Sequence, residues 1–362
     1  MSARALGRAT LARQMLLARE KATAIDAIGR LAGLQAQVAR PPFVGLWTRL
    51  HRFERNALLT VIRSRRIVRV TAMRATLHLM TASDYVALRG ALQPALTRGF
   101  TSIAKGRDSA FSVESMEAFG RKYFARRTTT FDALREAITT QHPDGDVRAM
   151  AYAIRCLVPL VQVPDDSSWG FPAKAGFTLA DTWLGKSVPC TDAPAHALVR
   201  KYLAAFGPAT PGDAQTWSAL QGLRPVFEEM RKDLVTFRDA RNRELFDLPE
   251  APRPDEDLPA PVRFLPEYDN LLLAHDDRTR VIADTHRPRI TTKNLIVPAT
   301  FLVDGMVAGT WRVERKKGTA TLALQPFDTL SKRIRGEVEA EGEALLRFVE
   351  PEATTTACAW LG

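Results

Sequence analysis

The stretch RNALLTVIRSRRIVRVTAMRATLHLMT, residues 55–81, passes from a helical pattern to a strand-like pattern. Its first part, 55–65, predicts a helix, and the β-rich remainder, 66–81, predicts a pair of strands. Upstream, apolar residues at helical spacing predict further helices within 6–16 and around 25–28. Helix, helix, helix and then a β-ribbon is the order of a winged helix-turn-helix, a module that places one helix against a DNA groove.

The same order recurs twice farther along the chain. Helical patterns at 113–125, 129–140 and 146–158 precede strand-like segments at 159–163 and 177–180. A third set has helical patterns at 196–206, 210–220 and 224–233, followed by a hairpin at 234–248. Residues expected to cap helix N-termini are Thr81, Thr130 and Thr210. The sequence therefore predicts three tandem winged-helix modules.

A proline-rich segment, DLPEAPRPDEDLPAPVRFLP from Asp247, separates these modules from a tail of different texture. The tail alternates apolar and polar residues around turns at Asp304-Gly305 and Lys317-Gly318, and a helix over 329–341 is expected to close it. We predict an α+β fold that is mainly α, with a C-terminal β-rich domain. The expected division is 1–98, 99–188 and 189–249 for the three winged helices and 250–362 for the linker and β-rich domain.

The composition favours a polyanionic partner and a reducing compartment. Lys and Arg number 51 against 40 Asp and Glu, a formal charge of +11 with a pI near 9.9, and nucleic acid is the commonest partner of such a surface. The chain has neither a run of about 18 apolar residues nor a basic membrane anchor, which argues against a membrane partner. Three widely spaced cysteines and no glycine-rich phosphate loop predict a cytoplasmic protein without a metal or other cofactor.

Two glutamines stand one residue apart in GRLAGLQAQVARPP, residues 29–42. Residues two apart lie about 200° apart around a helix but on the same side of an extended segment. Because Arg40 precedes a proline, we expect the chain to be extended there, so that Gln35 and Gln37 face out together. The residues expected to point inward are Leu34, Ala36 and Val38. A pair of amides can orient a water molecule but cannot strongly remove its proton. The alternative interpretation is that both glutamines are ordinary solvated residues at a helix end.

Longer segments resemble a known family. LQAQ followed by RPPFVGLWTRL, then VRVTAMRATLHLMTASDY, PATPGDAQTWSAL, FLPEYDNLLLAHDDR and FLVDGMVAGTW together resemble the winged-helix DNA glycosylases of the AlkZ and YcaQ type. The resemblance spans about residues 6–350 and implies three winged helices around a concave, basic DNA channel. It also implies a catalytic element of glutamine, a hydrophobic residue and then glutamine or aspartate, which here is Gln35-Ala36-Gln37 with a small spacer.

The glutamine form resembles the AlkZ branch, which is associated with bulky N7-alkylguanines and with unhooking the crosslinks of DNA-alkylating natural products, whereas the YcaQ branch carries aspartate. We therefore predict a monofunctional DNA glycosylase that hydrolyses the N-glycosidic bond of alkylated bases and leaves an abasic site. No lysine lies beside the motif to form a Schiff base, so lyase activity is not expected. The expected partner is double-stranded DNA that contains alkylated bases. The protein is expected to be a monomer associated with the nucleoid in a bacterial cytoplasm. Genotoxin self-resistance is one expected role.

The alternative is a non-catalytic winged-helix regulator or lesion-binding protein. Regulators generally bind as two-fold dimers, whereas three modules in one chain make an asymmetric monomer, which favours the enzyme. Candidate DNA-binding residues on the first ribbon and its approach are Arg63, Arg65, Arg66, Arg69, Arg74, Thr76 and His78. Candidates on two hairpin tips and in the tail are Arg238, Arg241, Arg243, Arg315, Lys316, Lys317 and Arg287. Ordinary solvated faces and turns would show the same pattern.

Two other features are expected to be structural. In AHDDR, residues 274–278, an ion pair with Arg278 is favoured over a metal site, since adjacent residues rarely converge on one ion. Trp217 and Trp311 occupy apolar positions and are expected in the core rather than against a base.

Overall fold

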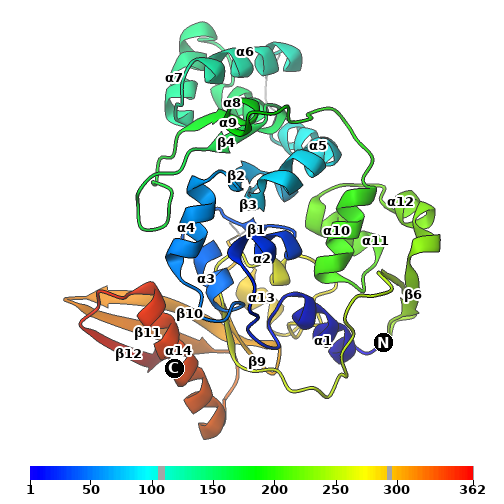
Figure 1. Cartoon of the computed structure of the whole chain (residues 1–362), viewed down its shortest axis with the longest axis vertical. Coiled ribbons are helices and arrows are strands. Elements are labelled where there is room, and N and C mark those ends of the chain that lie inside the picture. The colour runs from blue at the N-terminus through cyan, green and yellow to red at the C-terminus, as the bar shows by residue number, and fades with distance from the viewer. Residues whose placement is uncertain (105–110, 292–295, 362) are drawn as a thin grey trace.

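The computed structural model of the chain describes residues 1–104, 111–291 and 296–361. The architecture is mixed α/β, with a central sheet, a C-terminal sheet and helices around them (Figure 1). The stretch 55–81 forms a helix and two paired strands as predicted. The first third of the chain contains α1 (Ala3–Arg13), α2 (Ala24–Arg30), β1 (Leu34–Gln35), α3 (Pro41–Trp47), α4 (Arg55–Arg63), β2 (Ile67–Thr71), β3 (Leu77–Thr81) and α5 (Ala82–Ala104).

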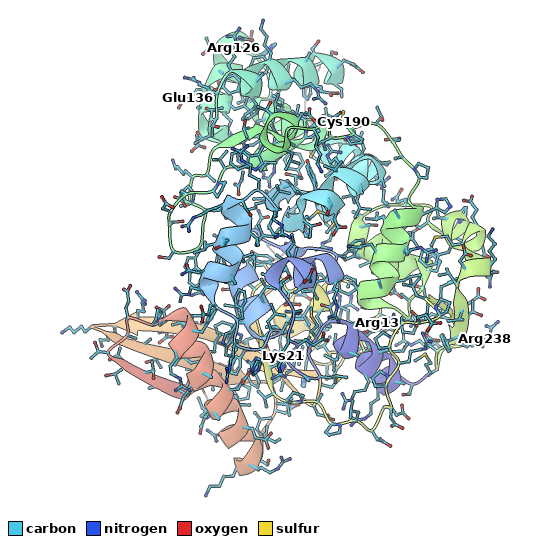
Figure 2. All side chains as sticks on the ribbon, viewed as in Figure 1. Arg13, Lys21, Arg126, Glu136, Cys190 and Arg238 are labelled. Atoms are coloured by element: carbon cyan, nitrogen blue, oxygen red, sulfur yellow. The ribbon has the colours of Figure 1, made fainter. Side chains whose placement is uncertain are left out.

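The second predicted set is also confirmed at the level of its elements. They are α6 (Val113–Arg126), α7 (Phe131–Gln141), α8 (Val147–Leu157), β4 (Leu160–Gln162), β5 (Phe177–Leu179) and the short α9 (Ala180–Leu184). The predicted caps at Thr81 and Thr130 are present, since their hydroxyls accept hydrogen bonds from the N–H groups of Asp84 and Ala133. In Figure 2, Arg126 and Glu136 mark this end of the molecule, well away from Arg238.

The third set comprises α10 (His196–Phe206), α11 (Pro211–Ser218), α12 (Arg224–Glu229), β6 (Val235–Arg238) and β7 (Glu244–Asp247). Thr210 and Asp213 form a full capping box at the start of α11. Trp217 is 1 % exposed, so its predicted core position is confirmed. It packs in the largest apolar cluster with Tyr202 and Phe206 of α10.

The central sheet joins strands from the first two sets in the order β1-β3-β2-β4-β5. The contact between β2 and β4 is antiparallel, with Arg69 opposite Gln162 and Val70 opposite Val161. The boundary expected after residue 98 falls inside α5, which packs on α8 and on the β2–β3 loop. The two ribbons therefore share one sheet, and each set buries apolar residues against the other.

The tail forms a second five-stranded sheet in the order β12-β11-β10-β9-β8. Its elements are β8 (Arg263–Leu265), α13 (Arg287–Ile290), β9 (Thr300–Val303), β10 (Met306–Lys316), β11 (Thr319–Pro326), α14 (Lys332–Val349) and β12 (Thr355–Trp360). Both predicted turns are present, with positive φ at Asp304-Gly305 and at Lys317-Gly318. The predicted core position of Trp311 is also confirmed, because it is 5 % exposed.

Three details of the fold differ from expectation. The closing helix α14 extends to Val349, because Leu345, Leu346 and Val349 continue its buried face beyond residue 341. Strand β12 runs parallel to β11 and was not predicted. Helix α3 was not predicted either, and Arg40 is helical rather than extended, with φ −69° and ψ −43°. Pro41 and Pro42 occupy the first turn of α3, where the missing N–H groups need no intrahelical partner.

Candidate active site

The glutamine pair lies at the edge of the central sheet. Gln35 ends β1 and stands opposite His78 of β3, so the segment is extended there as predicted. Leu34 and Ala36 are buried, and Gln35 is itself only 8 % exposed, whereas Gln37 is exposed. The prediction that Val38 points inward is wrong, because the chain bends away from the sheet after Ala36 and leaves Val38 52 % exposed.

Each glutamine amide is fixed through its oxygen. Arg74 donates from Nη2 to Gln35 Oε1 at 2.8 Å, and the N–H of Leu77 donates to Gln37 Oε1 at 3.3 Å. Both partners can only donate, so in each amide the oxygen must face the partner and the NH2 group must face away. Each oxygen keeps a second lone pair, and each NH2 group remains available to a water molecule or a substrate.

Arg74 lies in the tight loop η1 (Met73–Ala75) between β2 and β3, with φ at 55° and ψ at 22°. A left-handed conformation is uncommon for arginine and occurs at tight turns as well as at functional sites. Besides Gln35, its guanidinium donates to Asn270 Oδ1 at 2.9 Å and to the carbonyl of Trp217. Burial, and then the nearby Arg278, lower the pKa of Arg74 to about 10. Three of its five N–H donors therefore bond acceptors within the chain, and its role as a DNA contact stays a prediction.

Asn270 completes this network from a distant part of the sequence. It belongs to the 3-10 turn η3 (Asn270–Leu272), and its Nδ2 donates to the carbonyl of Gly33 at 3.2 Å. One amide therefore connects Arg74 to the backbone just before β1. We did not predict a role for Asn270, although it lies within FLPEYDNLLLAHDDR, one of the segments that carry the family resemblance.

Arg69 holds the backbone of the motif rather than a phosphate. It is 5 % exposed, and its Nε donates to the carbonyl of Ala36 at 2.9 Å while Nη2 donates to the carbonyl of Gln37 at 3.2 Å. Its guanidinium lies over the ring of Phe171, 4.9 Å from the centroid. Burial, and then Arg155, lower its pKa to about 10. The predicted phosphate contact is corrected because such an interior position leaves little surface for DNA.

The β1–β3 ladder is irregular beside the motif. A regular antiparallel ladder would pair the N–H of Leu77 with the carbonyl of Ala36. In the structure Ala36 donates to the carbonyl of Leu77 at 2.7 Å, but the return bond is replaced. The N–H of Leu77 bonds the Gln37 side chain, and Arg69 takes the freed carbonyl. The last step of the β1–β3 ladder is therefore converted into a support for the motif.

His78 is also buried, and Thr76 is half-buried. His78 is 0 % exposed, and its Nδ1 lies 3.1 Å from the carbonyl of Thr76, so that nitrogen carries the proton. Burial, and then Arg74, lower the pKa of His78 to about 3, which keeps the ring neutral. Thr76 donates to the carbonyl of Met73 within the η1 loop. The predicted DNA contact of His78 is corrected by its complete burial.

Other candidates of the first ribbon are exposed at the junction of α4 and β2. Arg63 pairs with Asp166 at 3.1 Å, with both side chains largely exposed. Arg65 donates to the carbonyl of Trp183 and lies over its ring. Arg66 is exposed and makes no ion pair with any carboxylate among the described residues. These three cations are free to approach a polyanion, since exposed pairs cost little to separate.

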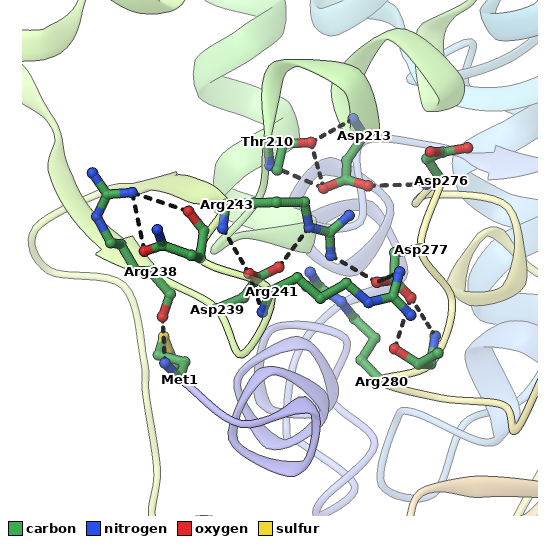
Figure 3. A network of polar contacts seen from close by, with 12 residues as sticks. Met1, Thr210, Asp213, Arg238, Asp239, Arg241, Arg243, Asp276, Asp277 and Arg280 are labelled. Carbon is green, nitrogen blue, oxygen red and sulfur yellow. Dashed lines mark hydrogen bonds and ion pairs between the residues drawn. The ribbon is translucent and has the colours of Figure 1, made fainter.

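The tip of the β6–β7 hairpin is held by carboxylates (Figure 3). Arg243 pairs with Asp239 and Asp277 at 2.7 Å each, and Arg241 pairs with Asp277 at 3.2 Å. Arg238 donates to the carbonyl of Asn242. Part of the positive charge expected at this tip is therefore neutralised within the chain.

The same network corrects the expected ion pair of Arg278. Asp277 pairs with the hairpin arginines instead, and Arg278 donates from Nε to the carbonyl of His275 at 3.3 Å. Burial, and then Arg287, lower the pKa of Arg278. Arg278 also lowers the pKa of Arg74, so its charge acts on the residue that holds Gln35, an effect that we did not predict from the sequence.

The last candidates lie at the tip of the β10–β11 hairpin and in α13. Arg315 pairs with Glu350 and is 62 % exposed, and Lys316 and Lys317 are also exposed. Arg287 is half-buried at the start of α13. None of these side chains is hydrogen-bonded to the glutamine pair within the described part of the chain.

Comparisons with known proteins identify the family of the chain. The sequence profile of the AlkZ-like DNA glycosylase family matches residues 28–348. The interstrand DNA cross-link repair glycosylase of Streptomyces sahachiroi is 25 % identical over 367 aligned positions, covering 92 % of this chain and 93 % of the relative. The solved structure of Streptomyces sahachiroi DNA glycosylase AlkZ superposes with a TM-score of 0.81 over the full length of both chains at 21 % identity. In the described part of this chain, no helix is both long and apolar enough for a membrane span. With a profile match that includes the glutamine pair, Arg69, Arg74 and Asn270, the chain belongs to the AlkZ-like DNA glycosylase family.

Proposed function

We propose that the chain is a monofunctional DNA glycosylase that removes alkylated bases, chiefly bulky N7-alkylguanine adducts, with Gln35 and Gln37 as its catalytic residues. The observation that carries the proposal is the pair of amides at the sheet edge, each fixed through its oxygen by a donor. Gln35 is nearly buried while Gln37 reaches the surface, so the pair lies between the interior and solvent.

The chemistry suits side chains that cannot titrate. Alkylation at N7 places a positive charge on guanine, so the base departs as a neutral molecule without protonation by an enzyme acid. Breaking the N-glycosidic bond leaves an oxocarbenium-like sugar. The free lone pairs of Gln35 and Gln37 would stabilise that charge and orient a water molecule toward C1′. Addition of water forms the new C–O bond, releases a proton to solvent and leaves an abasic site.

The supporting residues have distinct roles in this proposal. Arg74 fixes the Gln35 amide, and Arg69 fixes the two backbone carbonyls on either side of the Gln37 Cα. No lysine is hydrogen-bonded to either glutamine among the described residues, which supports hydrolysis without strand cleavage. In this proposal the nucleophile that attacks C1′ is a water molecule.

Substrate and architecture follow the relatives. The Streptomyces relative carries the name of an interstrand cross-link repair glycosylase, and we extend crosslinked N7-alkylguanine to this chain as a substrate class. We further infer three winged-helix modules around a concave DNA channel that a monomer forms alone. The first two modules share the central sheet, and α5 spans the boundary predicted after residue 98. The exposed arginines of the α4–β2 junction and the two basic hairpin tips are the proposed DNA contacts, in a protein that works at the bacterial nucleoid.

The test is base release from a duplex containing one N7-alkylguanine. Free base should appear in chromatography, and the product strand should break only after alkaline treatment, as expected of an abasic site. The same duplex without the lesion is the control. Binding to DNA without release of base from either a methylated or a bulky adduct would instead support a regulator or lesion-binding protein.

A further inference from the structure

A cavity of about 340 Å³ lies between α7, α8 and the central sheet, in the lobe drawn at the top of Figure 1. Its floor includes Gln162 of β4 and Leu77 of β3. Gln162 stands opposite Arg69, whose other neighbour Leu79 stands opposite Leu34. Because directly opposed residues share a face of a sheet, the cavity and Gln35 lie on opposite faces.

The lining of the cavity carries an excess of positive charge. Four cationic side chains line it, Arg135, Arg148, Arg155 and Lys174, against the single carboxylate Asp132. Asp132 is already shared by Arg135 at 2.8 Å and Lys174 at 3.1 Å. Arg148 and Arg155 make no ion pair with a carboxylate of the described residues. The site therefore has two cations without a counter-ion.

Arg155 is the more constrained of these two cations. Its Nε donates to the hydroxyl of Thr71 at 3.3 Å, which directs the remainder of the guanidinium to the cavity. The side chain is partly buried, and removing a cation from water without a counter-ion costs free energy. Gln162, 8 % exposed, adds an amide whose NH2 group could donate to a bound anion. A bound anion would also offset the cost of burying the Arg155 guanidinium.

The cavity is connected to the motif through one residue. The N–H of Leu77 bonds Gln37 Oε1, and the same residue lines the cavity. We propose that this cavity, here called the Arg155 pocket (Arg148, Arg155, Lys174 and Gln162), binds a backbone phosphodiester of the DNA substrate. The inference rests on the proposed glycosylase function. Since the pocket and Gln35 face opposite sides of the sheet, the bound phosphate flanks the damaged nucleotide rather than belonging to it.

The test is a scan of single methylphosphonates, which remove one backbone charge at a time. The duplex carries one 2′-fluoro N7-alkylguanosine, whose glycosidic bond resists hydrolysis, so binding is measured without reaction. Wild type should lose roughly 10-fold in affinity at one or two flanking positions, the cost of about 1–2 kcal/mol for a lost charged contact. The Arg148→Gln, Arg155→Gln variant should show no loss at those positions, and its salt slope should be smaller by about 0.9.

Controls separate this proposal from folding and from the function. Arg347→Gln removes an exposed cation of α14 that pairs with Glu343, and it should leave the scan unchanged. A second double variant, Arg148→Gln with Lys174→Ala, changes only exposed residues. It repeats the test if the Arg148→Gln, Arg155→Gln variant does not fold. The pocket is overturned if wild type loses affinity equally at all methylphosphonate positions. It is also overturned if wild type and the Arg148→Gln, Arg155→Gln variant are sensitive at the same positions. Position-specific loss without base release from the normal lesion would retain the pocket and refute the glycosylase.

Discussion

Replacing Arg74 by methionine tests whether the fixed amide of Gln35 contributes to catalysis. The change removes the bond to Gln35 Oε1 at 2.8 Å and leaves a side chain of similar length. A hydrogen bond to a charged group contributes about 1.5–3 kcal/mol. If that stabilisation is lost in the transition state, the rate should fall about 10- to 150-fold, at roughly 1.4 kcal/mol for each factor of ten.

The assay is single-turnover base release, with affinity measured separately on the non-hydrolysable duplex. Affinity should change by less than about threefold, because Arg74 is directed at protein acceptors rather than at DNA. Arg74→Lys should recover part of the rate, since one ammonium cannot reproduce the planar array of donors. Arg19→Met, which removes an arginine bonded to Glu341 and the carbonyl of Trp47, is the matched control. A folded Arg74→Met variant with a rate within twofold of wild type, or with a loss confined to affinity, would refute the reasoning.

Further predictions concern the interior and the exposed arginines. Burial lowers the pKa of His78 from 6.5 to about 3, so the folded state binds fewer protons than the unfolded chain between these values and stability declines as the pH falls below 6.5. His78 should contribute about 2 kcal/mol to the decline in the free energy of unfolding from pH 7 to pH 5, and His78→Gln should remove that contribution in urea unfolding; an unchanged pH dependence would contradict this. Arg69→Met should lower the free energy of unfolding by about 2 kcal/mol, because the buried carbonyl of Ala36 and the part-buried carbonyl of Gln37 lose their donor, and a thermal midpoint equal to wild type would argue against it. The exposed arginines of the junction, Arg63, Arg65 and Arg66, can all be replaced by glutamine. The salt slope of DNA binding should then fall by about 0.9 for each phosphate contact, while base release at saturating enzyme stays unchanged. An unchanged salt slope would contradict this prediction.

Most helices and strands could be predicted because their apolar residues recur at one period and their caps are local. Thr130 and the Asp304-Gly305 turn act within a few residues of the chain, and both are present. Helix α3 was missed because two consecutive prolines normally indicate a break. Strand β12 was missed because TTACAW consists mostly of small residues without a clear apolar alternation, and it pairs with the distant strand β11.

The strand that carries Gln35 was predicted, but the supports of the glutamine pair were not. Gln35 ends β1 and Gln37 lies just beyond it, and their catalytic role stays a prediction. The burial of Arg69 and Arg74 depends on segments that are distant in sequence, such as Phe171, Trp217 and Asn270. A run of arginines gives no local signal that separates a cation bound to carbonyls from one that awaits a phosphate.

The most direct measurement compares wild type with the Gln35→Ala, Gln37→Ala double variant on a duplex with one N7-alkylguanine. Single-turnover release should fall at least about 100-fold, while affinity for the non-hydrolysable duplex stays within about threefold, because both amides act on the transition state. Release at the wild-type rate by a folded double variant would show that water reaches C1′ without these side chains.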